Sequence, residues 1–308
     1  MFFLYALGGA ALALAAADRL LPGPLARASL ALERKRSGLT LRRGSLPYLE
    51  GGSGSEVLLL VHGFAGDKDN FTRIARLLVP HYRVIIPDLP GFGDACRDPS
   101  ARHDMAAQVE NLRVFMAELG VQHFHMGGNS MGGFIAAEYA ARYPEQVASL
   151  WLLAPAGTEA SFDTLAFQDY LAGGRMPLLV REPRDFEAMM AACMAKPPFF
   201  PYSLKQVLGR RAMADYTLHC ALMKELVNSP RLRGPIHTPA LIVWGTEDRI
   251  LSPKGAAATM ALMPNASLVM MEGVGHLPML EATRRTAHDF LAFQYAASAG
   301  AGQSTTGE

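Results

Sequence analysis

Short apolar runs alternate along the chain with longer segments in which apolar residues recur at helical spacing. Six of these runs, four to six residues long, have the pattern of buried strands. The predicted strands cover residues 57–61, 83–87, 124–127, 149–154, 240–244 and 267–271. Helices are predicted between or after them, at residues 70–78, 105–119, 132–142, 253–262 and 284–295. Alternating strands and helices of this kind predict an α/β domain with a mostly parallel central sheet.

The alternation stops between residues 157 and 235, where the pattern is helical throughout. Methionine adapts to irregular apolar shapes, so a cluster of methionines suits an acyl chain of variable length. Ordinary helix packing explains any single one of them, whereas the set as a whole favours the lining of an apolar pocket. The set comprises Met176, Met189, Met190, Met194, Met213 and Met223, with Phe162, Phe167, Phe199, Phe200 and Tyr202.

The first 17 residues contain no Asp, Glu, Lys, Arg or His. Continued through Leu21, a helix would measure about 32 Å, enough for a hydrocarbon core of about 30 Å. We predict a transmembrane anchor over residues 1–21 and a basic juxtamembrane segment over 22–45, helical to about residue 43 at the membrane surface. Two alternatives stay open: a cleaved signal peptide, although no Lys or Arg precedes the apolar run, and a buried core helix.

Small residues recur every fourth position in the predicted anchor, at Gly9, Ala13 and Ala17. This spacing lets two membrane helices approach closely, so a homodimer through the N-terminal helix is a hypothesis. Chance spacing explains it equally well in so alanine-rich a segment.

Composition and charge limit the classes of function that the chain can have. The 308 residues, half of them hydrophobic, are enough for one large core and an insertion. The net charge of +1 gives no reason to expect a nucleic-acid partner. The three cysteines are scattered, so neither a disulfide framework nor a metal site is predicted. Without a glycine-rich phosphate loop, no cofactor is expected either.

Residues 127–133 read Gly-Gly-Asn-Ser-Met-Gly-Gly and lie between a predicted strand and a predicted helix. The core of this motif is Gly128-x-Ser130-x-Gly132, the arrangement of a nucleophile elbow. The turn is too sharp for side chains beside the nucleophile, which explains the glycines. Ser130 is therefore the candidate nucleophile.

Two further candidates follow predicted strands. Asp248 comes after the strand at 240–244, and His276 after the strand at 267–271. An Asp after a strand is commonly a turn residue, and a lone His is commonly structural. Nucleophile, acid and histidine in this chain order, each beyond a strand end, instead indicate a catalytic triad. We assign His276 as general base and then acid, and Asp248 as the group that orients it.

Three further stretches carry a resemblance to a known family. Residues 62–71 resemble the oxyanion loop of the monoacylglycerol-lipase-like branch of the α/β-hydrolases. Residues 87–93 resemble its fourth-strand loop, and residues 154–157 the end of its sixth strand. Together with the apolar N-terminus, residues 38–295 are similar to bacterial membrane-anchored lipases and phospholipases of the A type.

The resemblance implies an α/β-hydrolase fold, with core segments at residues 46–156 and 236–295. It places a helical cap at residues 157–235, and we expect a flexible tail at 296–308. It also implies that the backbone N–H groups of Phe64 and Met131 form the oxyanion hole. His62 is expected to brace the loop through hydrogen bonds rather than to act on substrate.

We therefore predict a membrane-anchored serine ester hydrolase that releases fatty acids from lipid esters through an acyl-enzyme. Its partners would be the lipid ester, the fatty-acid product and the bilayer. Monoacylglycerol, lysophospholipid and phospholipid all remain open as substrates. Acyl-thioesterase, carbon–carbon hydrolase and perhydrolase activities share the triad, and a non-catalytic fatty-acid-binding membrane protein is the alternative from another class. The resemblance favours a periplasmic domain on the inner membrane, whereas the basic juxtamembrane residues favour the cytoplasmic side.

Overall fold

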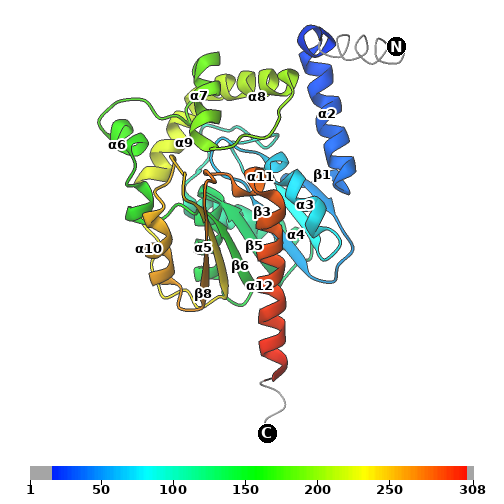
Figure 1. The fold of residues 1–308 in the computed structure, drawn as a ribbon, viewed down its shortest axis with the longest axis vertical. Coiled ribbons are helices and arrows are strands. Elements are labelled where there is room, and N and C mark those ends of the chain that lie inside the picture. Colours follow the sequence, from blue (N-terminus) through cyan, green and yellow to red (C-terminus); the bar gives the residue numbers. More distant parts are fainter. Residues whose placement is uncertain (1–15, 304–308) are drawn as a thin grey trace.

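An eight-stranded sheet forms the centre of the computed structural model, which describes residues 16–303 (Figure 1). The strand order is β1-β2-β4-β3-β5-β6-β7-β8. Strand β2 pairs antiparallel with β1 on one side and with β4 on the other, and all pairs from β4 to β8 are parallel. The strands are β1 (Leu39–Arg43), β2 (Pro47–Gly51), β3 (Val57–Val61), β4 (Arg83–Pro87), β5 (Phe124–Asn129), β6 (Val147–Leu153), β7 (Ala240–Gly245) and β8 (Ala266–Met271).

The predicted α/β class and mostly parallel sheet are confirmed, and the six predicted strands correspond to β3 through β8. Strands β3 to β7 could be predicted because they are buried along almost all of their length, so each is a largely apolar run. Strand β8, at the edge of the sheet, is partly exposed but is also apolar in sequence. Strands β1 and β2 were not predicted. Four of the five β1 residues are exposed, and β2 contains a proline and a glutamate, so neither has the pattern of a buried strand.

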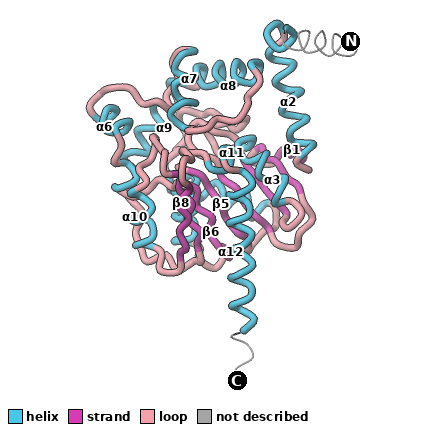
Figure 2. Tube along the Cα trace, in the orientation of Figure 1, coloured by secondary structure: helices cyan, strands magenta, loops and turns pink. Residues whose placement is uncertain are grey.

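Helices cover both faces of the sheet (Figure 2). Along β3, Leu58 and Leu60 belong to one buried cluster, while Leu59 and Val61 belong to the other. This alternation follows from the two-residue period of a strand. The first face carries α3 (Thr72–Leu78) after a short helix η1 (Lys68–Phe71), with α11 (Pro278–Glu281) and α12 (Thr283–Gln303). The second carries α4 (Met105–Glu118), α5 (Met131–Arg142) and α10 (Lys254–Leu262).

A helical insertion separates β6 from β7. In Figure 1 it lies over one end of the sheet, and its residues share a cavity with the ends of β3, β5 and β8. Hereafter we call residues 157–235 the cap segment. Its elements are η2 (Glu159–Phe162), α6 (Leu165–Leu171), α7 (Pro183–Cys193), α8 (Tyr202–Ala214) and α9 (Tyr216–Asn228).

Helix α2 (Pro22–Arg36) packs along α8 of the cap segment. Just before α2, the Asp18 carboxylate accepts hydrogen bonds from the backbone N–H groups of Tyr202 (2.9 Å) and Ser203 (3.2 Å). These are first-turn groups of α8 that no helix can satisfy internally. Among residues 16–303, no helix is both long and apolar enough to cross a bilayer. Residues 1–15, most of the predicted anchor, lie outside the described residues, as do Gly9 and Ala13.

Two boundaries differ from those expected. The juxtamembrane helix ends at Arg36 rather than near residue 43, because Gly38 adopts a φ of +68° and the chain turns into β1. Helix α12 continues to Gln303, so the first eight residues of the predicted flexible tail, 296–303, are helical. Four of these eight residues are alanine, the residue that most favours a helix.

The packing of α12 against the sheet leads to a test. The Phe290 ring is fully buried and stacks on Trp151 of β6 at a centroid distance of 4.3 Å. Phe290→Ala should lower the free energy of unfolding by roughly 3–5 kcal/mol, because it leaves a cavity under the helix. Tyr295→Ala, at an 80 % exposed site of the same helix, should change it by less than about 0.5 kcal/mol. Urea unfolding would measure both, and equal effects would contradict this packing.

Candidate active site

Ser130 occupies a sharp turn between β5 and α5. Its φ of 57° is in the left-handed region, which costs a non-glycine residue on the order of 1–3 kcal/mol. The neighbouring glycines allow the turn to form. A Cβ on Gly128 would lie 2.2 Å from the Gly132 carbonyl oxygen, and one on Gly132 would lie 2.2 Å from the Val61 carbonyl oxygen. The elbow therefore packs backbone to backbone against the end of β3.

The structure brings Asp248 and His276 into direct contact. One Asp248 carboxylate oxygen lies 2.8 Å from Nδ1 of His276, and both side chains are buried. The other oxygen accepts 2.9 Å hydrogen bonds from the N–H groups of Ile250 and Leu251, which fix the carboxylate in place. A carboxylate at Nδ1 keeps the proton of a neutral imidazole there, so Nε2 is left to accept one.

Ser130 and His276 line the same cavity. In the part of the chain that the structure describes, no hydrogen bond joins their side chains. Catalytic bonds of this kind commonly tighten only when substrate is bound, so the separation is compatible with a serine–histidine pair.

The loop after β3 packs directly on the nucleophile. A Cβ on Gly63 would lie 3.1 Å from Cβ of Ser130. Among the described residues, the backbone N–H groups of Phe64 and Met131 have no hydrogen-bond acceptor. Met131 directly follows Ser130, and Phe64 follows Gly63 and lines the same cavity as Ser130. Two unpaired donors beside a serine are what an oxyanion requires. The next residue, Ala65, is itself in the left-handed region, with a φ of 57°.

His62 braces this loop, as the sequence predicted. The Leu89 N–H donates to Nε2 at 3.0 Å, so the neutral ring carries its proton on Nδ1, which lies 2.8 Å from the Gly63 carbonyl oxygen. Complete burial lowers the pKa of His62, which keeps the ring neutral in this role.

Sequence reasoning missed two residues that hold the histidine loop. The Asn129 side-chain amide donates 3.0 Å bonds to the carbonyl oxygens of Leu153 and His276, so it joins the elbow to the loop after β8. The Glu281 carboxylate accepts from the N–H groups of Gly275 (3.0 Å) and Lys196 (2.9 Å). Asn129 lies inside the elbow motif, but no pattern in the sequence indicates a contact with the histidine loop.

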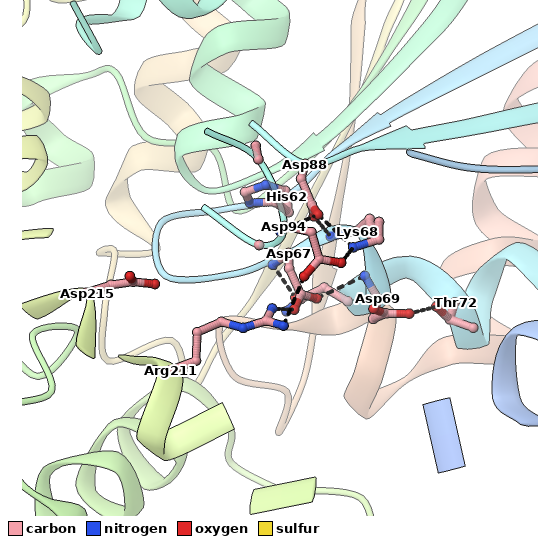
Figure 3. A network of polar contacts seen from close by, with 12 residues as sticks. His62, Asp67, Lys68, Asp69, Thr72, Asp88, Asp94, Arg211 and Asp215 are labelled. Atoms are coloured by element: carbon pink, nitrogen blue, oxygen red, sulfur yellow. Dashed lines mark hydrogen bonds and ion pairs between the residues drawn. The ribbon is translucent and has the colours of Figure 1, made fainter. Parts of the chain in front are cut away.

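A buried cation anchors the oxyanion loop to the loop after β4 (Figure 3). The Lys68 ammonium lies 2.6 Å from a carboxylate oxygen of Asp88 and 2.6 Å from one of Asp94. The Lys68 backbone N–H donates to the second oxygen of Asp88 at 2.7 Å. Burial alone would lower the pKa of Lys68, but the two carboxylates outweigh it and raise that pKa. Lys68 therefore stays charged despite its almost complete burial.

A cavity of about 410 Å³ extends from Ser130 beneath the cap segment towards α2. This volume is within the range of ligand pockets, about 300–1,000 Å³. Among residues 16–297, no group of three or more His, Cys, Asp or Glu side chains is placed to hold a metal ion. The cap contributes apolar lining from Leu178, Phe186, Met189, Met190, Met194 and Leu204, while Asp67, Arg73 and Arg211 add charge.

Comparison with known proteins decides the family. Residues 56–187 match the model of the α/β-hydrolase fold. Lipase 1 of Psychrobacter immobilis is 39 % identical over 267 residues, which cover 83 % of each chain. The chain belongs to the α/β-hydrolase family. The resemblance read from the sequence motifs is therefore confirmed.

Two further relatives bear on the branch of the α/β-hydrolases. The monoacylglycerol lipase ABHD6 of Bos taurus is 29 % identical over 253 residues, covering 76 % of this chain and 75 % of that protein. The crystal structure of a membrane phospholipase A, a bacterial virulence factor, superposes with a TM-score of 0.85 at 38 % identity. That superposition covers 96 % of this chain and 99 % of the other.

The buried lysine offers a test of how this α/β-hydrolase supports its oxyanion loop. Lys68→Met removes the cation but keeps the length of the side chain, leaving Asp88 buried without a counter-charge. The free energy of unfolding should fall by roughly 3–5 kcal/mol. Lys254→Met is the matched control, because Lys254 pairs with Asp163 on the surface, where an ion pair contributes little. Denaturant unfolding of both variants would show equal losses if the Lys68 pair were unimportant.

Proposed function

We propose that the protein is a serine hydrolase of lipid esters, with Ser130 as nucleophile, His276 as general base and acid, and Asp248 as the orienting carboxylate. The observation that carries this proposal is the 2.8 Å Asp248–His276 contact at the cavity that Ser130 also lines. The relatives named lipase and monoacylglycerol lipase support a lipid ester as the substrate.

The reaction begins when Nε2 of His276 accepts the proton of the Ser130 hydroxyl as its oxygen attacks the ester carbonyl carbon. The carbonyl oxygen becomes an oxyanion and accepts hydrogen bonds from the N–H groups of Phe64 and Met131. Asp248 stabilises the imidazolium that forms. Losing one oxyanion donor typically costs roughly 3–4 kcal/mol of transition-state stabilisation, so the position of the Phe64 loop matters for rate.

The tetrahedral intermediate collapses when His276 gives its proton to the leaving alcohol. The fatty acyl group then remains on Ser130 as an ester. His276 next takes a proton from water, whose oxygen attacks the acyl carbonyl and releases the fatty acid. Each proton passes through His276, so neither a metal nor a cofactor enters the scheme.

The cavity supports an acyl chain as the group held beside Ser130. Three flexible methionines of the cap, Met189, Met190 and Met194, line it. Monoacylglycerol, lysophospholipid and diacyl phospholipid each carry such a chain, and the choice among them depends on where the alcohol part lies. A small apolar thioester would fit the same triad, so it belongs among the substrates to be tested.

Fatty-acid release in detergent micelles is the direct test of this function. Ser130→Ala and His276→Ala should each abolish release from monoacylglycerol, lysophospholipid or phospholipid, because either change removes the path to the acyl-enzyme. Both variants should keep the wild-type far-ultraviolet circular dichroism. Near-normal turnover by His276→Ala would show that another group is the base, and release from an acyl-thioester alone would move the function to a thioesterase.

A fluorophosphonate probe separates the hydrolase from a non-catalytic fatty-acid-binding protein. The probe reacts with an activated serine, so wild-type protein should be labelled at Ser130 and Ser130→Ala should not. Ser161, also buried but away from the elbow, should stay unlabelled and serves as an internal control. A folded wild-type protein that resists labelling would favour the binding protein.

We also propose an arrangement of the chain at the membrane. Residues 1–21 would form a single-pass anchor in the inner membrane, residues 22–45 a basic juxtamembrane segment, and residues 157–235 a cap over a periplasmic catalytic domain. The name of the structurally similar membrane phospholipase A supports membrane attachment. A homodimer through Gly9, Ala13 and Ala17 would follow from the same helix.

Fractionation of cells tests the anchor. The full chain should sediment with membranes, and a variant lacking residues 1–21 should become soluble while keeping its fold. Protease added to spheroplasts should digest the catalytic domain if that domain is periplasmic.

Cross-linking tests the homodimer. It should capture a dimer that the double variant Gly9→Leu, Ala13→Leu loses, and an undiminished dimer would reject this helix face.

A further inference from the structure

One arginine of the cap segment forms an ion pair with the oxyanion loop (Figure 3). Arg211, in the last turn of α8, places Nη1 3.0 Å from a carboxylate oxygen of Asp67 and Nη2 3.2 Å from one of Asp94. Asp67 lies three residues after Phe64. A second ion pair joins the cap to the loop after β4 with the charges reversed: Arg97 of that loop binds Asp215, directly after α8, at 2.7 and 3.0 Å.

Asp67 is also the residue that starts the helix after the oxyanion loop. Its side chain accepts from the Asp69 N–H at 2.9 Å, and its own N–H donates to the Asn70 side chain at 2.8 Å. Between Phe64 and Asp67, the Gly66 N–H bonds the Gly63 carbonyl at 3.1 Å, and Ala65 holds its left-handed conformation. Such a conformation persists only where surrounding contacts hold it. The conformation of this short loop therefore depends on the contacts that hold Asp67 in place.

We propose that Arg211 is a positioning residue for the oxyanion hole: its ion pair with Asp67 ties the cap to the loop and so sets the place of the Phe64 N–H. This inference rests on the proposed function for the role of Phe64. The cap would then have two roles. It lines the cavity, and its docking against the oxyanion loop fixes the position of an oxyanion donor. Arg211 itself touches neither the reacting atoms nor Ser130.

Charges from four elements surround Asp67. Lys68 and Asp69 come from η1, Asp88 and Asp94 from the loop after β4, Arg211 from α8, and Arg34 from α2 through its bond to Asp69. Burial, followed by Asp69 and Asp88, raises the pKa of Asp67 to about 7, while Arg211 and Lys68 act to lower it. Asp67 is thus ionised above about pH 7 and increasingly protonated below it. Its attraction to Arg211 is present above that pH and is lost as the pH falls through it.

The test compares kcat and KM for fatty-acid release by wild type, Arg211→Gln, Asp67→Asn and the double variant. Measurements at about pH 6 and about pH 8.5 bracket the titration of Asp67. At the higher pH, Arg211→Gln should lower kcat about threefold or more with little change in KM, since the lost contact acts on the transition state. At the lower pH the loss should shrink. In the Asp67→Asn background, Arg211→Gln should have the same small effect at both pH values.

Taking ratios at each pH removes every pH dependence that all four proteins share. Arg210→Gln is the matched control, because Arg210 is the exposed neighbour on α8 and joins none of the ion pairs among residues 16–303. Arg211→Lys keeps the charge and should recover part of the lost kcat. The proposal is overturned if Arg211→Gln matches Arg210→Gln, or if its effect on kcat does not depend on pH while Asp67 is present.

Hydrogen exchange gives a readout that needs no turnover. At about pH 8.5, backbone amides of residues 63–70 should exchange faster in Arg211→Gln than in wild type at the same pH. The Arg210→Gln protein should match wild type. Unchanged exchange would reject the tie between cap and loop even in an active enzyme. Faster exchange in a protein that shows no Ser130-dependent release would keep the tie and reject the proposed function instead.

Discussion

The active site depends on the close approach of the elbow backbone to the backbone at the end of β3. No side chain fits between Gly132 and the carbonyl oxygen of Val61, so α5 begins directly against β3. This closeness puts the N–H of Met131, the Ser130 side chain and the loop that carries Phe64 around one point. Asn129 then ties the histidine loop to the same turn. The parts of the site come from four strand ends, but they are aligned by this single approach of two backbones.

The buried Lys68–Asp88 ion pair also holds the oxyanion loop in place. Asp88 accepts from the Lys68 ammonium, the Lys68 backbone and the Asp94 backbone, so its oxygens are satisfied in a place that water does not reach. Burying two ions is unfavourable compared with packing apolar side chains, and such pairs are better explained by the geometry that they specify. Here that geometry is the course of the oxyanion loop. The loop includes Ala65 in a conformation that an unsupported chain would abandon.

The sequence predicted those features that short local patterns encode. Strands β3 to β7 are buried along almost all of their length and appear in the sequence as short apolar runs, and the elbow is marked by glycines that its tight turn requires. The pairing of Arg211 with Asp67 was beyond reach, because the partners are 144 positions apart and each resembles an ordinary surface charge. Strand β1 was missed for a related reason: its side chains face mostly solvent, so its place in the sheet is set by pairing with β2. A sequence pattern predicts which residues are buried, whereas these contacts form between residues that are brought together only in the folded chain.

The point at which the cap segment is inserted has an evolutionary consequence. The chain leaves the sheet at the end of β6 and returns in β7, the adjacent strand, where Leu153 pairs with Val243. The entropy of closing such an excursion grows only slowly with its length, so caps of very different size can be exchanged without rebuilding the sheet. A replacement must reproduce a few contacts: partners for Arg97 and Asp67 near the end of α8, and for Glu281 and the His276 backbone after α7. Substrate preference can therefore diversify among descendants of this scaffold while the catalytic centre is inherited unchanged.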